Sequence, residues 1–320
     1  MPVLVTGGTG YLGGAVVKAL SEKEPVRLLV HDARRTHSFS KLPHLSFVIG
    51  DMRDPDALAA AVKGCKAVFH LAALVKSWVK DARLFETVNV EGFRNLAEAS
   101  WKEGVQRFVY TSSFLALGPT EKDPAQTVFQ NPYALSKKKA LLLAREYQRK
   151  GYPLITVVPT VLYGPGARTE GNHMSRLLER LARGRFPGWI DGGRWKWNVA
   201  YVEDVAAGYP VLFERGKSGE EYVLGGEAVT LREFFTAAAE LAGVSLPNRE
   251  LSLRLLRWHA AFQEFLARVL YCEPSLTRGI LETYRHDWAP RDDKARQELG
   301  YVTTPLRAAL AKTIEWLKHS

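Results

Sequence analysis

The segment "NPYALSKKKALLL", residues 131–143, places a tyrosine and a lysine four positions apart at the start of an apolar-periodic stretch. In a helix, Tyr133 and Lys137 would lie on one face, one turn apart. A free tyrosine has a pKa near 10, which is a poor match to proton transfer at neutral pH. Because a nearby ammonium favours the phenolate, we expect Lys137 to lower the pKa of Tyr133. The same spacing also occurs on ordinary helix surfaces, so a catalytic interpretation needs support from the rest of the chain.

A glycine-rich segment near the N-terminus supplies part of that support. In "VLVTGGTGYLGGAVVKAL", residues 3–20, three glycines lie between a strand-like and a helix-like stretch. Gly7 would permit a tight turn, Gly10 would let a pyrophosphate approach the backbone, and Gly13 would let the helix pack closely on the sheet. The phosphates would then lie at the helix N-terminus. Since the loop follows a strand and opens an amphipathic helix, it predicts dinucleotide binding.

Short apolar, β-branched segments alternate with helix-length stretches over the first half of the chain. The strand-like segments are "PVLVT", "VRLLV", "LSFVI", "KAVFHL", "RFVYTS" and "LITVVP". This alternation predicts a parallel sheet covered on both faces, that is, a doubly wound α/β domain of the Rossmann type over residues 1–165. Residues 166–320 are predicted to form a smaller, helix-rich, substrate-binding part. Within them, about 198–224 reads as a strand and a helix that return to the first domain.

Composition excludes several classes of protein. The chain has 320 residues, of which 46% are hydrophobic and 24% charged, as in ordinary globular proteins. It has no run of about 18 uncharged apolar residues, so we expect no membrane-spanning helix. The N-terminus lacks the parts of a signal peptide. Cys65 and Cys272 are too few and too far apart for a disulfide framework or a metal site. We therefore expect a cytoplasmic protein without a metal.

The net charge is +10, from 44 Lys and Arg against 34 Asp and Glu. A basic balance can indicate nucleic acid, an anionic membrane or phosphate-bearing ligands. Here the basic residues are spread along the chain, and the longest run is the "KKK" of residues 137–139. Scattered charge of this kind favours solubility rather than a nucleic-acid partner.

Several further segments resemble the extended short-chain dehydrogenase/reductase family, also called the NAD-dependent epimerase/dehydratase family. The glycine loop has this family's form "TGxxGxxG", and the family's blocks follow in its order over almost the whole chain. They are "GDMRD" (50–54), "VFHLAA" (68–73), "NVEGFRNLAEA" (89–99), "VYTSS" (109–113), "YALSK" (133–137), "PTVLYGPG" (159–166) and "DDKARQELGY" (292–301). The chain most resembles the dihydroflavonol-4-reductase-like branch and its bacterial relatives described as sugar epimerases.

The resemblance implies roles for three side chains. Tyr133 would donate or remove the proton on the substrate oxygen. Lys137 would lower the pKa of the tyrosine and bind the nicotinamide ribose. Ser113 would hydrogen-bond the reacting carbonyl, with Ser112 as the alternative. Ser113 follows the strand "RFVYTS", and strand C-termini form the binding crevice of an open α/β sheet.

The resemblance also implies a set of cofactor-binding residues. Asp51 and Met52 would flank the adenine, residues 71–73 would line the cleft, Asn89 would support it, and Pro159 would lie near the nicotinamide. The full predicted set is Gly7, Thr9, Gly10, Tyr11, Leu12, Gly13, His31, Arg34, Arg35, Asp51, Met52, Leu71, Ala72, Ala73, Asn89, Thr111, Tyr133, Lys137 and Pro159. For Asn89 and the two alanines, a packing role is an equal alternative.

The second strand bears on the choice between NADP and NAD. An NAD-preferring member usually ends this strand with an acidic residue that binds the ribose 2′-hydroxyl. Here "VRLLV" is followed by His31, then Asp32, then Arg34 and Arg35. The arginines could hold a 2′-phosphate, so we predict NADP, and Asp32 keeps NAD as the alternative.

Two departures from the family's patterns narrow the reaction. Dehydratase members carry carboxylates directly after the catalytic hydroxyl residue, where this chain has residues 114–116, "FLA". Many nucleotide-sugar epimerases have an Arg-Pro-x-Asn block, where this chain has Val158 and Val161 at the two polar positions. We therefore predict reduction of a carbonyl on a small organic substrate, with epimerisation of a sugar as the alternative.

Two segments of the second half allow more than one interpretation. Trp189, Trp195 and Trp197 alternate with basic residues, and they could form a lid over the substrate or pack the smaller domain. Such residues also suit stacking on single-stranded nucleic acid, a minor alternative. The stretch "LSLRLLRWHAAFQEFLARVLY", residues 251–271, is amphipathic. It could bind a membrane surface or an oily substrate, or it could pack in a core or in a homodimer.

Overall fold

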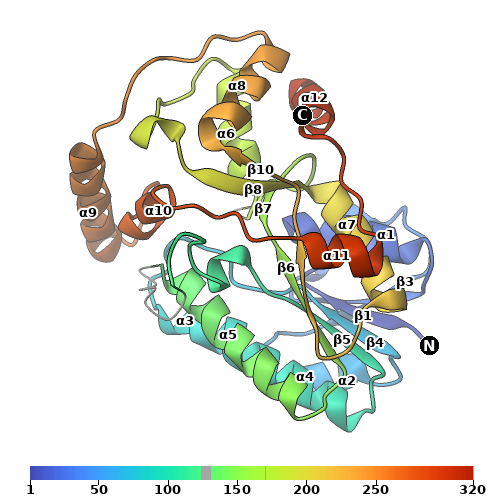
Figure 1. Ribbon diagram of the computed structural model, residues 1–320. Helices are drawn as coiled ribbons and strands as arrows, with labels where there is room; N and C mark the ends of the chain where they lie inside the picture. The colour runs from blue at the N-terminus through green and yellow to red at the C-terminus, as the bar shows by residue number, and fades with distance from the viewer. Residues whose placement is uncertain (124–130, 170, 320) are drawn as a thin grey trace.

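The computed structural model describes residues 1–123, 131–169 and 171–319, and in them seven parallel strands form the larger of two sheets (Figure 1). The order is β3-β2-β1-β4-β5-β6-β9, so strand addition reverses direction between β1 and β4. The strands are β1 (Val3–Thr6), β2 (Val26–Val30), β3 (Leu45–Ile49), β4 (Ala67–His70), β5 (Arg107–Thr111), β6 (Leu154–Pro159) and β9 (Glu221–Leu224). In such a sheet, ligands bind beyond the strand C-termini at the point of reversal. The predicted doubly wound Rossmann-type fold is confirmed.

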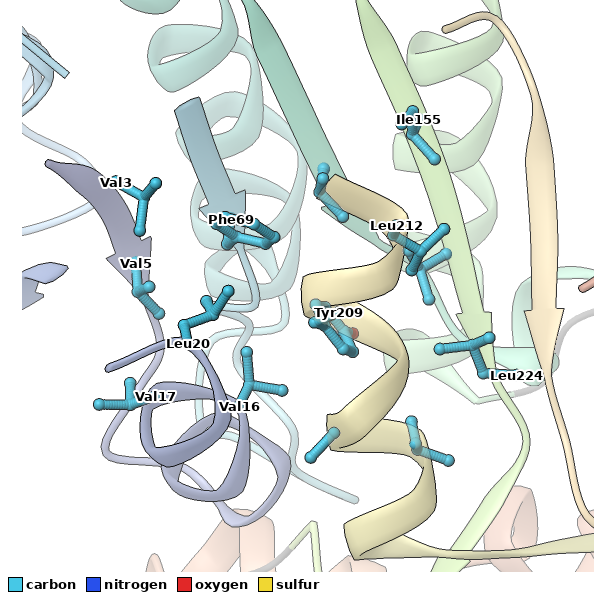
Figure 2. Packing of buried hydrophobic residues seen from close by; sticks show 14 of the residues in the cluster. Val3, Val5, Val16, Val17, Leu20, Phe69, Ile155, Tyr209, Leu212 and Leu224 are labelled. Atoms are coloured by element: carbon cyan, nitrogen blue, oxygen red, sulfur yellow. The ribbon is translucent and has the colours of Figure 1, made fainter. Parts of the chain in front are cut away.

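Helices cover both faces of this sheet, as the apolar alternation requires. On one face lie α1 (Tyr11–Ser21) and α7 (Val202–Arg215), and on the other lie α2 (Pro55–Val62), α4 (Gly92–Lys102) and α5 (Pro132–Arg149). Strand β1 shows why: Val3 and Val5 enter the cluster beneath α1 and α7, whereas Leu4 enters the opposite cluster. Figure 2 shows the first cluster, in which Tyr209 of α7 lies on the side facing Val16 of α1 and Leu212 lies on the side of Ile155.

The connection from β4 to α4 contains a short helix and a π-helical turn. Helix α3 (Arg83–Glu86) runs through the π turn at 87–91 into α4. Such turns are frequent at functional sites because they re-aim one side chain within a helix. Asn89, one of the predicted cofactor residues, lies on this turn.

The second part of the molecule has its own small sheet. Strands β7 (Val161–Tyr163), β8 (Lys196–Tyr201) and β10 (Glu227–Thr230) pair in the order β10-β8-β7. They pack with α6 (His173–Ala182), α8 (Leu231–Ala242) and α12 (Leu306–His319) around a second core of aromatic and aliphatic side chains. Helices α9 (Leu253–Leu270) and α10 (Arg278–Thr283) lie at the periphery, and α11 (Asp293–Leu299) packs beside α7 and β9 (Figure 1).

The segment 198–224 is divided between the two parts rather than returning as a whole. Strand β8 pairs with β7 and β10 in the small sheet, while α7 packs on α1 and β9 joins the large sheet beside β6. The side chain of Asn198 helps to hold β8 there, because its Oδ1 accepts from the backbone N–H of Gly226 at 2.7 Å. The chain therefore crosses between the sheets at the start of α7. Among the described helices, none is both long and apolar enough to cross a membrane.

Candidate active site and cofactor cleft

Helix α5 begins directly before the tyrosine because of its capping residues. Asn131 Oδ1 accepts from the backbone N–H of Tyr133 at 2.9 Å, and Pro132 occupies the first turn. An Asn cap followed by proline is a strong helix start. The start of the helix thus places Tyr133 in its first turn and Lys137 one turn further along, as the sequence predicts.

The side chain of Lys137 is buried at the end of β5. Its Nζ donates to the backbone carbonyl oxygen of Thr111 at 2.7 Å and lies 4.8 Å from the centre of the Tyr110 ring. Burial lowers the pKa of Lys137 to about 7, because a desolvated ammonium is disfavoured. The lysine is therefore fixed in position, and near neutral pH its protonated and neutral forms are both populated.

The structure brings Ser113 to Tyr133. A hydrogen bond with Ser113 favours the phenolate of Tyr133, but burial acts more strongly and raises the pKa of Tyr133 to about 12. This is the opposite of the direction expected from Lys137, because desolvation disfavours the charge on both side chains. The hydroxyl of Ser112 lies instead beside the phenol of Tyr110. Of the two candidate serines, only Ser113 interacts with Tyr133.

Two further hydrogen-bonded pairs fix the surroundings of this site. The hydroxyl of Thr111 lies 2.9 Å from that of Tyr209 on α7, so Thr111 is held through both its backbone and its side chain. Asn89 donates to Ser136 Oγ at 2.9 Å and accepts from the N–H of Leu74 at 2.7 Å. Asn89 is thus fully engaged by protein, and any effect on a cofactor would pass through these contacts. No motif in the sequence distinguishes Tyr209 from the rest of its amphipathic helix.

The glycine loop has the shape of a phosphate cradle. Gly7 has a φ of +75°, and a Cβ there would come within 2.4 Å of the backbone nitrogen of Ala72. A Cβ on Gly13 would meet the carbonyl oxygen of Gly7 at 2.1 Å. Gly10 is the N-cap of α1. The first turn of α1 has no side-chain cap, and phosphate binding by its backbone N–H groups stays a prediction.

A buried threonine–histidine pair supports this loop from below. Thr6 Oγ1 lies 2.8 Å from His70 Nδ1 and accepts from the N–H of Ala72 at 3.3 Å. The ring of His70 is stacked on Phe93, with centroids 5.7 Å apart. Burial, with the nearby Lys137, lowers the pKa of His70 to about 3, so the ring is neutral. His70 therefore positions the segment that contains residues 71–73, which we predicted to line the cleft.

Next to the loop, the side chains of Tyr11 and Leu12 are occupied by protein contacts. The hydroxyl of Tyr11 donates to the carbonyl oxygen of Gly164 at 2.9 Å, which joins α1 to the second part of the chain. Leu12 packs against the cluster beneath α1. Contacts of these two residues with a cofactor would therefore use their backbone N–H groups. Thr9 lies half-buried in the turn before α1.

At the C-terminal end of β2, the acidic and basic candidates are paired with each other. Asp32 accepts from the backbone N–H of Arg34 and from its guanidinium, at 2.9–3.2 Å. This pairing lowers the pKa of Asp32 to about 2. His31 and Arg35 are exposed beside them. Asp32, the residue invoked for NAD, is thus paired with Arg34, one of the two arginines invoked for NADP.

The remaining candidates lie along the same edge of the sheet. Beyond β3, Arg53 binds Asp51 through a forked contact that lowers the pKa of that carboxyl to about 2. Met52 follows and lies close to α4, since a Cβ on Gly92 would come within 3.1 Å of its carbonyl oxygen. Pro159 is buried at the end of β6, opposite Leu224 of β9. These are the positions that the resemblance assigns to the adenine and nicotinamide ends of a cofactor, and the individual contacts stay predictions.

The three tryptophans pack within the second part of the chain. Trp189 and Trp197 are buried in its core, and their indole N–H groups donate to the carbonyl oxygens of Pro247 and His286. Trp195 is half-buried, and its indole donates to Asp191. Of the two interpretations of this segment, packing accounts for these contacts. Within the described residues, no group of three or more His, Cys, Asp or Glu side chains could hold a metal ion.

Comparison with known proteins gives the family. The profile of the "NAD dependent epimerase/dehydratase family" matches residues 3–225. The chain is 30% identical to the "Putative dihydroflavonol 4-reductase" of Synechocystis, over 98% of this chain and 94% of that protein. It is 29% identical to the "4-hydroxy-2-methyl-3-oxo-4-farnesyl-3,4-dihydroquinoline-1-oxide ketoreductase" of Stigmatella aurantiaca, over 94% of this chain and 92% of that protein.

Solved structures show the same fold over the whole chain. The crystal structure of gox2253 superposes with a TM-score of 0.82 at 35% identity, covering 99% of this chain and 98% of that one. A dTDP-glucose 4,6-dehydratase from Streptomyces venezuelae, solved with NAD bound, superposes with a TM-score of 0.79 at 24% identity, covering 100% and 98%. The chain therefore belongs to the NAD-dependent epimerase/dehydratase family of extended short-chain dehydrogenases/reductases, and it is an NAD(P)-dependent oxidoreductase.

Proposed function

We propose that the protein reduces the ketone of an apolar organic substrate with NADPH, and that Tyr133, Lys137 and Ser113 carry out the proton transfer. The observation that supports this best is the juxtaposition of the three side chains beyond the C-terminal end of β5. Ser113 follows that strand and interacts with Tyr133, while Lys137 is bound to Thr111 at its last position.

In this proposal, Tyr133 is the general acid. A pKa of about 12 keeps its phenol protonated at neutral pH but also makes it a weak acid, so the phenolate formed in the reaction needs stabilisation. Ser113 orients the substrate by a hydrogen bond to the carbonyl oxygen. Lys137, held by Thr111, favours the phenolate that Tyr133 becomes after it has given up its proton. The nicotinamide supplies the hydride when it is bound.

The cofactor would lie along the strand C-termini. The pyrophosphate would be held by backbone N–H groups of the loop from Gly7 to Gly13, at the first turn of α1, which no side chain caps. Arg34 and Arg35 would bind the 2′-phosphate of NADPH. For this, the guanidinium of Arg34 would leave Asp32, an exchange that costs little because the pair is exposed. If Asp32 bound the ribose instead, the protein would prefer NAD.

Two observations favour reduction over sugar chemistry. The side chain after Ser113 is Phe114, whose ring packs edge-on against Trp288 with centroids 5.4 Å apart, so no carboxylate stands there to assist dehydration. Val158 and Val161, at the positions of the epimerase Arg and Asn, are buried. Neither can donate a hydrogen bond to a nucleotide sugar.

The site and the relatives together support a substrate with a large apolar group. The names of three relatives contain a farnesylated quinoline oxide, a sterol and a 2-alkyl-3-oxoalkanoate, and two of the three are named as reductases. All three molecules have large apolar groups. In this protein, a cleft of about 680 Å³ beside Pro132, which precedes Tyr133, has a mixed lining: the apolar Trp78, Phe85 and Tyr271, and charged side chains that include Lys80 and Arg268. Its aromatic side chains would contact an apolar group attached to the reacting ketone, and its charged ones would contact a polar end of the substrate.

The deciding experiment determines whether the protein exchanges its cofactor at every turnover or keeps it bound. An epimerase returns the hydride to its own substrate, whereas a reductase must exchange its cofactor at every turnover. We expect the protein to purify largely free of nicotinamide and to oxidise NADPH with 2-alkyl-3-oxoalkanoates or other long-chain ketones. Nucleotide sugars are tested in the same assay, and the stereochemistry of their products is determined. Tightly retained NAD, with sugar epimerisation and no net consumption of NADPH, would overturn the reductase proposal.

A further inference from the structure

The outer face of α9 carries a continuous stripe of exposed, large apolar side chains. Its members are between 55% and 72% exposed, and they are Leu255, Trp258, Phe262, Phe265 and Val269. Their spacing of three and four residues puts them on one side of the helix. On the opposite side, the buried residues are the small Ala260 and Ala267. The helix thus lays its small residues on the protein and presents its large ones outward, the reverse of a core helix.

Positive charge accompanies this stripe. Arg254, Arg257 and Arg268 are exposed on the same helix. The one acidic residue of α9 is Glu264, which is turned inward with a side chain 15% exposed and is bound by Arg278 at 2.8 Å. The outer face therefore presents aromatic and aliphatic groups beside arginines, with no exposed carboxylate of its own helix.

We propose that α9 is a docking surface for an anionic lipid bilayer, on which it lies parallel to the membrane plane. Helices that bind there bury Trp, Phe and Leu at the headgroup boundary, while Lys and Arg contact anionic headgroups. The stripe matches this composition, because aromatic rings make up its central three positions. The position of α9 at the periphery of the molecule leaves this face accessible (Figure 1).

A second copy of the chain fits the same face less well. A two-fold symmetric contact would pack the stripe against itself in antiparallel register. Arg254 and Arg257 of one copy would then face the partner helix near its Arg268, at the other end. Such a contact would bring like charges together, and Glu282, which lies 3.6 Å from Arg257, would compensate them only in part, so the contact is unfavourable.

The docking surface adjoins the cleft described above. Arg268 and Tyr271, at the C-terminal end of α9, line that cleft together with Pro132. Lys80 lies 3.9 Å above the ring of Tyr271 and joins the loop on the far side of the cleft to the helix end. An apolar ketone dissolved in the bilayer would thus enter beside α9. This consequence rests on the proposed function, whereas lipid binding itself does not.

The test is sedimentation of the full chain with vesicles, which needs neither substrate nor cofactor. We expect the protein to bind vesicles of phosphatidylcholine mixed with phosphatidylglycerol, and to bind phosphatidylcholine alone at least about tenfold more weakly. Trp258→Ser/Phe262→Ser/Phe265→Ser should weaken binding to the mixed vesicles by at least about tenfold. Arg254→Gln/Arg257→Gln should reduce the preference for anionic lipid.

Controls keep this test independent of folding and of the proposed reaction. Ile49→Ser/Val302→Ser removes two exposed apolar side chains outside α9 and should bind as the wild type does. All variants should keep the wild-type melting temperature within a few degrees, since the altered side chains are exposed. Failure of the wild type to sediment, or equal sedimentation of wild type and triple variant, would overturn the proposal. So would a wild-type dimer in light scattering that the triple variant splits, with no binding to vesicles.

Discussion

The ammonium nitrogen of Lys137 lies 2.7 Å from the carbonyl oxygen of Thr111, so the last residue of β5 holds the lysine that stands one helical turn beyond Tyr133. This contact joins the sheet to the helix that carries both candidate catalytic residues. It also buries a positive charge, and that burial has a consequence for stability.

Removal of Lys137 should change the dependence of stability on pH. The pKa of this lysine is lowered from 10.5 to about 7 in the folded protein, so between these values the unfolded chain binds a proton that the native state does not. Its contribution to stability therefore improves as pH rises, by at most about 1.4 kcal/mol per pH unit. The free energy of unfolding of Lys137→Met should therefore exceed that of the wild type by a larger margin at pH 7 than at pH 10. Urea unfolding at both values measures this, and a difference that does not change with pH would contradict it.

His70 should make the protein sensitive to acid. Its pKa is lowered to about 3, whereas in the unfolded chain it takes up a proton below its ordinary value of 6.5. Stability should therefore fall as pH decreases from 6.5 towards 3, again by at most about 1.4 kcal/mol per unit from this residue. His70→Gln should lose less stability than wild type between pH 7 and pH 4.5 in urea titrations. Parallel losses in the two proteins would show that the buried ring is not responsible.

Alanine substitutions at two glycines of this segment should distinguish a position where the backbone leaves no room for a Cβ from a position where a Cβ fits. Gly7→Ala combines a positive φ with a Cβ 2.4 Å from Ala72 N, and we expect a loss of more than about 2 kcal/mol in stability together with the loss of cofactor binding. Gly14→Ala is the matched control, because its Cβ meets only Gly8 O, at 3.6 Å. In the helix it should stabilise by about 0.5–1 kcal/mol. If both variants bound NADPH as tightly as wild type, the loop would not be the phosphate cradle.

The pair formed by Asp32 and Arg34 should decide cofactor preference. In Arg34→Ala/Arg35→Ala, a 2′-phosphate loses its partners and Asp32 is freed, so affinity for NADPH should fall by about tenfold or more while affinity for NADH holds or rises. Arg83→Ala is the control, since Arg83 binds Asp81 with the same forked geometry away from this edge. Fluorescence titrations with both cofactors provide the measurement. Unchanged affinities in the double variant would exclude the arginines from 2′-phosphate binding.

The sequence predicts most of the fold because its signals are local. The six segments that the pattern predicts as strands in the first half of the chain all lie in the large sheet, whereas the strand order and the seventh strand, β9, are seen only in the structure. The small sheet is different: β7 has three residues, and β8 finds its antiparallel partner β10 about thirty positions later, so pairing there depends on tertiary contacts. For this reason the pattern at about 198–224 predicts a strand and a helix that return to the first domain but not the small sheet, which β8 joins.

The site shows the same division. Residue types alone predict the spacing of Tyr133 and Lys137 on one helix and the position of Ser113 after a strand. The direction of the pKa of Tyr133 is not, because it depends on how deeply the phenol is buried, and burial outweighs the hydrogen bond from Ser113. Three contacts likewise have no motif in the sequence. They are the pairing of Asp32 with Arg34, the contact of Tyr209 with Thr111 and the hydrogen bond from Tyr11 to Gly164.

The most direct test of the account is the turnover of Tyr133→Phe on a ketone that the wild type reduces with NADPH. The substitution removes the transferable proton and keeps the ring, so kcat should fall by about 10² or more while the Kd for NADPH, measured by fluorescence, stays within about twofold. A Phe variant that reduces the same ketone at the wild-type rate would show that Tyr133 is not the proton donor.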